Sequence, residues 1–302
     1  MRTKFKASVT VLSLLIIAGA FLSCAGKARA AASGFIIPVP SAPGVAVQNN
    51  KKAIIDYSNA KDGYVMVKYV QSTAKRLKTI VKGPSGASYT YSISPGKFEV
   101  FPLSDGNGSY TVGVYEQVEG TKYAVANTAT MRVALTNEFV PFLSPNQYVN
   151  YNKDSQTVKQ AAELVRNAAG LIDKIAAVYN FVVNNFSYDK ELAKTVQSGY
   201  LPDVDAVLRR KKGICFDYAA VMTAMLRSMG IPCKLVVGYA GEIYHAWINV
   251  YSKETGQVNQ VIYFDGRSWK LMDPTFASSA KQSSDIMRYI GDGSNYRAKF
   301  AY

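Results

Sequence analysis

A cysteine, a histidine and an aspartate follow one another in the second half of the chain. They are Cys215, His245 and Asp273, which stand 30 and 28 residues apart, and His245 is the only histidine. A thiolate can act as a nucleophile, an imidazole can take up the thiol proton, and a carboxylate can hold the imidazole in the required tautomer. The three residue types are therefore candidates for a thiol-based catalytic triad.

The residues after the cysteine predict a helix that begins beside it. Apolar residues recur at helical spacing between Phe216 and Met229. Gly230 and Pro232 then predict the end of the helix. We expect Cys215 at the helix N-terminus, where unpaired amides and the helix dipole lower the pKa of a thiol and can stabilise an oxyanion.

The histidine and the aspartate fall on predicted strands. The alternating pattern of 244–251 predicts a strand on which His245 and Trp247 share one face. A second short strand, 269–272, leads directly to Asp273, and the next residue is a proline that ends it. The elements therefore place a helix N-terminus opposite two neighbouring strands.

Four motifs around these residues carry a family resemblance. They occur in the order G-x-C-x-D-Y-A, R-S-x-G-I-P, H-A-W and D-P-T. Together they resemble the transglutaminase-like superfamily, a branch of the papain-like cysteine enzymes, over residues 157–302. The family includes cross-linking enzymes, peptidases, amidases and members that have lost activity, so the resemblance implies a mechanism more closely than a substrate.

The resemblance implies a fold and a role for each residue. The fold would be α+β, with a helical N-terminal part and the cysteine helix packed on an antiparallel sheet. Cys215 would be the nucleophile, His245 the base and acid, and Asp273 the residue that orients the imidazole.

Further residues are candidates to line the site. Trp247 and Asp217 belong to the motifs, and Tyr188 lies in a segment that resembles the turn the family has after its second helix. For Tyr188, a packing role and a role in the site both remain open. We expect no metal and no cofactor, because one histidine and no C-x-x-C pair provide too few zinc ligands.

The N-terminal residues 1–30 have the pattern of an export signal. Three basic residues precede an apolar run over 9–22, which is short for a membrane-spanning helix. Phe21-Leu22-Ser23-Cys24 resembles a bacterial lipobox, which would leave Cys24 lipid-modified, whereas Ala28-Arg29-Ala30 fits an ordinary signal peptidase. Both readings predict an extracytoplasmic protein, either a membrane-anchored lipoprotein or a secreted one.

The charge of the chain is strongly basic. Removal of residues 1–23 takes away three basic and no acidic residues and lowers the net charge from +14 to +11. Such a charge favours an anionic envelope polymer, a membrane surface or an acidic substrate as partner, although a solvated basic surface explains it equally well. Nucleic acid is not expected, because no basic helix or aromatic-basic recognition motif is present.

Two domains follow the predicted signal. Residues 34–136 show about seven short strands separated by turns, which predicts an immunoglobulin- or fibronectin-like β-sandwich. Its last two segments are expected over 123–126 and 129–135. Residues 137–156 read as a linker and 157–302 as the catalytic domain, with helices from about 155 to 170 and from 171 to 185. The tail after Phe276 offers a short helix near 285–289 and no residue for chemistry.

These features predict an exported thiol enzyme that attacks amide or peptide bonds of protein or peptidoglycan-type substrates. The acyl-enzyme would pass to water or to an amine, and the sequence leaves that choice open. Two other functions remain. The chain could be a catalytically silent binding or scaffold protein, or an adhesin whose β-sandwich binds cells or wall polymer.

Overall fold

The computed structural model describes residue 35 and residues 37–302. The predicted export signal, both cleavage sites and Cys24 lie outside the described residues. No helix in this described part is both long and apolar enough to cross a membrane. Helices and antiparallel sheets occur together, which confirms the predicted α+β class.

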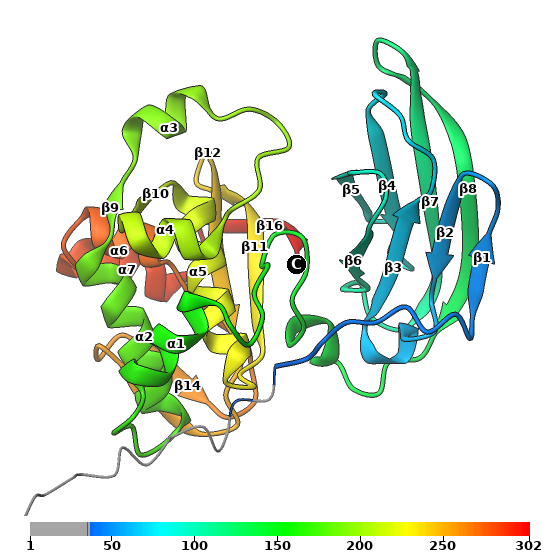
Figure 1. The fold of residues 1–302 in the computed structure, drawn as a ribbon. Coiled ribbons are helices and arrows are strands. Elements are labelled where there is room, and N and C mark those ends of the chain that lie inside the picture. Colours follow the sequence, from blue (N-terminus) through cyan, green and yellow to red (C-terminus); the bar gives the residue numbers. More distant parts are fainter. Residues whose placement is uncertain (1–34, 36) are drawn as a thin grey trace, which may run out of the picture. The chain divides into compact units, whose positions relative to one another are not determined.

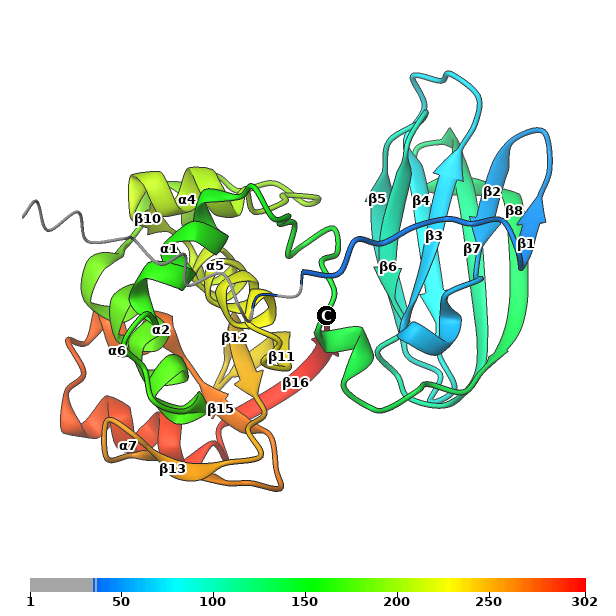
Figure 2. The ribbon, with the colours of Figure 1, turned by 60° about the horizontal axis from the view of Figure 1, so that its bottom comes forward.

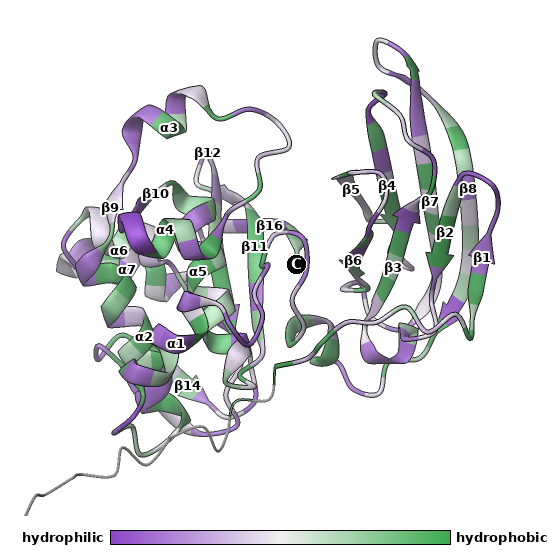
Figure 3. Cartoon of the chain, in the orientation of Figure 1, coloured by the Kyte–Doolittle hydropathy of each residue, from purple (hydrophilic) through white to green (hydrophobic). Residues whose placement is uncertain are grey.

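The strands before the linker build a β-sandwich, as predicted (Figure 1). Their bounds are β1 (Val47–Asn49), β2 (Ala53–Asp56), β3 (Tyr64–Tyr69), β4 (Leu77–Lys82), β5 (Ser88–Ile93), β6 (Phe98–Pro102), β7 (Gly108–Glu119) and β8 (Lys122–Val133). One antiparallel sheet has the order β1-β2-β3-β6 and the other β5-β4-β7-β8. Hydrophobic and hydrophilic residues are interspersed along these strands (Figure 3), and burial alternates most regularly along β4 and β5.

The sandwich differs from its prediction at its last strand. The segments expected over 123–126 and 129–135 form the single strand β8, which pairs with β7 along most of its length. The pairing shifts register between Val114 and Tyr115 of β7, close to the point where the sequence pattern suggested a break, and β8 continues through it. On β8, the Asn127 amide donates to the carbonyl of Ala53 at 2.7 Å and so ties β8 to β2. Two short 3-10 helices, Ala60–Asp62 and Val140–Phe142, lie in the connections.

The remainder of the chain combines seven α-helices with a four-stranded antiparallel sheet within the described part. The helices are α1 (Gln156–Leu164), α2 (Leu171–Asn185), α3 (Lys190–Thr195), α4 (Val204–Arg210), α5 (Cys215–Ser228), α6 (Pro274–Ser279) and α7 (Ser284–Asp292). The strands are β9 (Ser187–Tyr188), β10 (Lys212–Gly213), β11 (Cys233–Ala240), β12 (Ile243–Val250), β13 (Thr255–Val258), β14 (Ile262–Asp265), β15 (Lys270–Met272) and β16 (Tyr296–Ala301). The four-stranded sheet has the order β15-β12-β11-β16.

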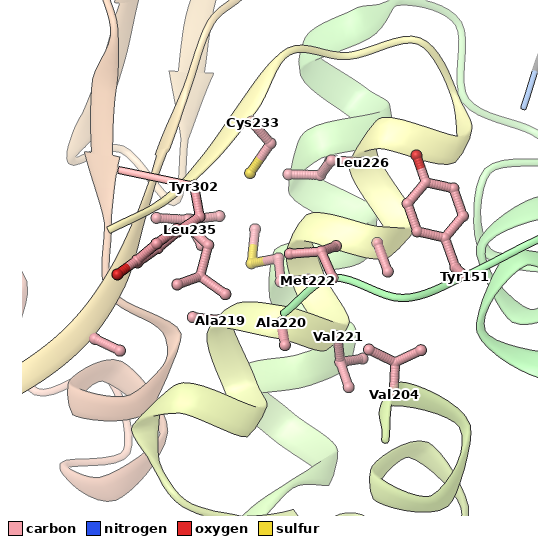
Figure 4. Packing of buried hydrophobic residues seen from close by; sticks show 14 of the residues in the cluster. Tyr151, Val204, Ala219, Ala220, Val221, Met222, Leu226, Cys233, Leu235 and Tyr302 are labelled. Atoms are coloured by element: carbon pink, nitrogen blue, oxygen red, sulfur yellow. The ribbon is translucent and has the colours of Figure 1, made fainter. Parts of the chain in front are cut away.

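Helix α5 is the centre of this core. It contacts β11 and β12 on one side and α1, α2 and α4 on others (Figures 1 and 2). All of its residues from Asp217 to Ser228 are buried, as expected for a helix whose surroundings are apolar all round. Figure 4 shows Met222 and Leu226 of this helix near Cys233 and Leu235 of β11. Cys233 is completely buried and is a free thiol, and it packs in this core.

Both helices predicted before α5 are present, and one of them is shorter than expected. Helix α2 has the expected bounds, whereas α1 ends at Leu164 and not near Gly170. Gly170 is extended, and its amide donates to Oδ2 of Asp173 at 3.3 Å. Gly170 therefore begins α2, and the residues between the two helices must turn.

Candidate active site

Cys215 is the first residue of α5, the position expected from the sequence. The preceding residue, Ile214, is extended, with φ −91° and ψ 176°. Its amide donates to Oδ2 of Asp217 at 2.8 Å, which fixes the start of the helix. The amide of Cys215 itself lies in the first turn, where a helix has no internal acceptor for it. The half-buried thiol therefore lies beside a backbone donor at the positive end of the helix dipole.

His245 and Asp273 are brought together by neighbouring strands. His245 lies on β12, Asp273 follows β15, and these strands pair with Ile248 opposite Met272. Nε2 of His245 lies 2.7 Å from Oδ2 of Asp273, and both side chains are buried. The pairing of β12 with β15 thus joins two residues that are 28 positions apart.

The Asp273 carboxylate is fully surrounded by donors. Oδ1 accepts from the amides of Thr275 at 3.0 Å and Phe276 at 2.9 Å, and so caps α6. Oδ2 accepts from the Tyr296 hydroxyl at 2.8 Å, besides the imidazole. Four donors from three elements of the chain therefore hold this buried carboxyl group in place.

The charge state of His245 follows from these partners. Burial alone lowers its pKa, but hydrogen bonds and negative charge from Asp273 and Cys215 outweigh burial and raise the pKa to about 9. The stability contributed by protonated His245 is therefore fully present below its unfolded pKa of about 6.5 and is lost as the pH rises through about 9. Since Nε2 faces Asp273, Nδ1 is the ring nitrogen left for the thiol.

Aromatic rings hold the imidazole from its sides. The Phe276 ring is stacked on His245, with centroids 4.3 Å apart and planes at 18°. Trp247 is buried and lies 6.4 Å from the imidazole, while its other contact is the Tyr296 ring at 5.1 Å. Trp247 therefore packs behind the histidine. It does not line the cleft beside Cys215 and His245, although the sequence suggested it as a lining residue.

A cleft of about 450 Å³ lies beside Cys215 and His245. Tyr188, one of the predicted site residues, lines it, whereas Asp217 is completely buried behind it. The other aromatic residues of the lining were not expected from the sequence: Tyr148, Tyr200, Phe216, Tyr244 and Tyr302. Tyr244 is 59% exposed, so the cleft is open to solvent on the side of β12.

Three residues that contact the candidate site residues were not predicted from the sequence. Tyr296 binds Asp273, Phe276 stacks on His245, and Tyr200 donates to Asp217 at 2.7 Å. The tail after Phe276 was expected to hold no residue for chemistry, and the contact of Tyr296 corrects that expectation. The chain has 21 tyrosines, and neither composition nor a short motif distinguishes Tyr200 and Tyr296 from the other tyrosines.

The contact of Tyr296 leads to a testable prediction. Replacing Tyr296 by phenylalanine removes one donor from the Asp273 carboxylate and leaves the ring in place. We expect alkylation of Cys215 by iodoacetamide to slow about fivefold to tenfold, the equivalent of one charge-assisted hydrogen bond. Tyr289→Phe is the matched control, because Tyr289 packs on Tyr296 at 5.7 Å without contacting Asp273 through a recorded hydrogen bond. Equal rates in both variants would contradict a positioning role for Tyr296.

No group of three or more His, Cys, Asp or Glu side chains suited to hold a metal ion occurs in the part of the chain that the structure describes. The groups near Cys215 are of types that acyl-transfer chemistry can use: a thiol, an imidazole and a carboxylate, beside an amide at a helix N-terminus.

Part of the chain matches a known protein family. Residues 158–274 match the family model of the transglutaminase-like superfamily. The matched segment contains Cys215, His245 and Asp273. The chain therefore contains a transglutaminase-like domain, and the resemblance of its four motifs is confirmed.

Three known proteins are similar to parts of this chain. Kyphoscoliosis peptidase of Mus musculus is 26% identical over 117 residues, which are 39% of this chain and 17% of that protein. The uncharacterized protein YebA of Bacillus subtilis is 27% identical over 171 residues, 50% of this chain and 22% of YebA. The chain thus spans about a fifth of the length of these relatives. A crystal structure of a proposed cysteine protease from Cytophaga hutchinsonii is 18% identical, covers 70% of this chain and 78% of its own, and has a TM-score of 0.37.

Proposed function

We propose that this protein is a cysteine enzyme that cleaves or transfers acyl groups at amide bonds through Cys215, His245 and Asp273. The observation that carries the proposal is the buried His245–Asp273 pair, 2.7 Å apart, beside a thiol at the N-terminus of α5. Such a pair supports a thiolate–imidazolium couple, because the pKa of His245 is raised to about 9.

The first half of the reaction forms a thioester. Sγ of Cys215 attacks the carbonyl carbon of the substrate, and the carbonyl oxygen becomes an oxyanion. The amide of Cys215 is oriented to donate to this oxygen. The C–N bond then breaks, and the leaving amine takes the proton of the His245 imidazolium.

The second half regenerates the thiol. Neutral His245 takes a proton from water or from an amine, which attacks the thioester carbon. The C–S bond breaks, and the product is a carboxylic acid or a new amide. Asp273 keeps the imidazole in place for both proton transfers.

The substrate class and the place of action rest on the sequence. We propose that the enzyme acts outside the cytoplasm on protein or peptidoglycan-type substrates, either as a lipoprotein modified at Cys24 or as a secreted protein. The pattern of residues 1–30 and the basic net charge support this, since envelope polymers are commonly anionic.

The experiment uses casein as acyl donor and a fluorescent primary amine, dansylcadaverine, as acceptor. Transfer gives fluorescent casein, whereas hydrolysis gives new N-termini or ammonia. A parallel incubation with purified peptidoglycan sacculi tests the wall substrate. Cys215→Ala is the control and should abolish every product.

A product that depends on Cys215 supports the enzyme and decides between water and amine as acceptor. The absence of all products, together with a Cys215 thiol that reacts no faster than free glutathione, would contradict the proposal and favour a binding or scaffold protein.

A further inference from the structure

One wall of the cleft is a loop that a side-chain hydrogen bond joins to the first turn of α5. The residues between α3 and α4 contribute Val196 to Tyr200 to the lining of the cleft. The Tyr200 hydroxyl donates to Oδ1 of Asp217 at 2.7 Å. The proposed mechanism uses neither residue.

The local backbone directs Tyr200 to this contact. The amide of Tyr200 donates to the carbonyl of Gln197 at 3.2 Å and closes a four-residue turn. Gly199, at the third position of the turn, has φ +90°, a conformation that glycine adopts without strain. The turn thus brings the tyrosine from an otherwise exposed loop into the cleft.

Asp217 connects this loop to the nucleophile. Its side chain is completely buried, and its two oxygens bind different elements. Oδ1 accepts from Tyr200, while Oδ2 accepts from the amide of Ile214, the residue before Cys215. One carboxylate therefore fixes both the start of α5 and the wall that faces it.

The chemistry of the cleft restricts what can enter it. Among its lining residues in the described part there is no Asp, Glu, Lys or Arg. Six aromatic rings line it instead: Tyr148, Tyr188, Tyr200, Phe216, Tyr244 and Tyr302. The only one of these described lining side chains that can carry a positive charge is His245, which is already paired with Asp273, so a charged substrate side chain would lose hydration there and find no free partner among the lining residues. A planar apolar group could instead stack on the rings.

From these observations we propose that the acyl donor carries an uncharged, apolar and preferably aromatic side chain beside the attacked carbonyl. We further infer that Tyr200, held by Asp217, is the residue that determines this specificity. This inference rests on the proposed function, since it assigns the substrate of the same site.

The test uses three thiol-alkylating probes on the full chain. Iodoacetamide is small and neutral, iodoacetanilide adds a phenyl ring, and the para-carboxylate analogue of iodoacetanilide adds a negative charge to that ring. In each case Sγ of Cys215 attacks the methylene carbon and iodide leaves. Rates at Cys215 are read by peptide mass spectrometry and divided by the rates with glutathione, which removes the intrinsic reactivity of each probe.

The expected result is a preference that depends on Tyr200. The normalised alkylation rate at Cys215 should be about tenfold or more higher with iodoacetanilide than with iodoacetamide. The carboxylate analogue should not show this increase. In Tyr200→Phe the ratio of the normalised rate with iodoacetanilide to that with iodoacetamide should fall severalfold, because the loop no longer has its hydrogen bond to Asp217. Gly199→Ala is the second variant, since it strains the turn but keeps every lining side chain. Tyr263→Phe is the matched control, because Tyr263 lies 54% exposed on β14 and does not line the cleft.

Failure of this inference can be distinguished from failure of the proposed function. If Cys215 is activated towards iodoacetamide but the carboxylate probe reacts as well as the phenyl probe, the apolar specificity is wrong. If the aromatic ratio is the same in wild type, Tyr200→Phe and Gly199→Ala, the role of Tyr200 is wrong. If Cys215 reacts no faster than glutathione with any probe, the proposed function fails and this inference fails with it.

Discussion

Replacing Asp273 by asparagine is expected to slow alkylation of Cys215 about 30- to 100-fold in mildly acidic solution. The two oxygens of Asp273 accept from donors on opposite sides, two amides on Oδ1 and the imidazole with the Tyr296 hydroxyl on Oδ2. An asparagine side chain has one oxygen and one NH₂ group in place of the two carboxylate oxygens. Either the two backbone amides or the imidazole and the Tyr296 hydroxyl must therefore face the NH₂ group, which cannot accept a hydrogen bond. The imidazole then loses either its orientation or its charge, and the thiol loses its base.

The same substitution should also lower stability. A buried donor without an acceptor costs about 1–3 kcal/mol, and we expect a loss of this size in the free energy of unfolding by urea. Asp265→Asn is the matched control. Asp265 also accepts from two amides and a hydroxyl and pairs with Lys270 at 2.8 Å, but it is the last residue of β14 and its side chain is 36% exposed, so water can replace a lost partner. An Asp273→Asn variant with wild-type alkylation would show that Asp273 does not act through His245.

Replacing Arg227 by methionine is expected to lower the free energy of unfolding by about 3–5 kcal/mol. Arg227 is completely buried in the last turn of α5. Its guanidinium donates to the carbonyls of Cys233 at 2.9 Å and Ser144 at 2.7 Å, and also to that of Tyr302. The side chain therefore joins the linker, β11 and the strand end after β16 to the central helix.

Methionine fills a similar volume but removes the guanidinium donor from three buried carbonyls, of which that of Tyr302 still accepts from the Leu235 amide at 3.0 Å. Arg166→Met is the control, because Arg166 is exposed and its recorded partner is Glu163 at 3.4 Å. We expect the control to change the free energy of unfolding by no more than about 0.5 kcal/mol. The measurement is urea unfolding of the full chain. A loss below about 1 kcal/mol in Arg227→Met would mean that water or a rearranged backbone satisfies these carbonyls.

Local patterns were sufficient to predict the elements that carry the candidate triad. Helical periodicity after Cys215, alternation around His245 and the proline after Asp273 each reflect the backbone of a single element. Their joint arrangement followed from the four motifs. The start of the helix at Cys215 was predictable for the same reason, since its capping residues lie within three positions.

The surroundings of the site depend on pairings that no local pattern specifies. Tyr296 reaches Asp273 only because β16 pairs with β11, with Tyr296 opposite Ala240. Tyr200 reaches Asp217 through a turn in a loop. Alternation correctly placed Trp247 on the strand of His245, but it could not indicate that Tyr296 covers that side chain and buries it.

The central claim is that His245 activates Cys215. Its most direct test is the pH dependence of iodoacetamide labelling at Cys215, in wild type and in His245→Ala. Labelling is followed on the Cys215 peptide, because Cys233 is free as well, although burial raises the pKa of Cys233 to about 12.

In wild type we expect the labelling rate to rise well below about pH 8.5, the ordinary pKa of a free thiol, and to change again near pH 9, where His245 loses its proton. In His245→Ala the low-pH labelling should disappear, and the rate should rise only at about pH 8.5 or above. A wild-type thiol that labels slowly at neutral pH, with the same profile in both proteins, would contradict the activated pair and with it the account of this protein as an enzyme.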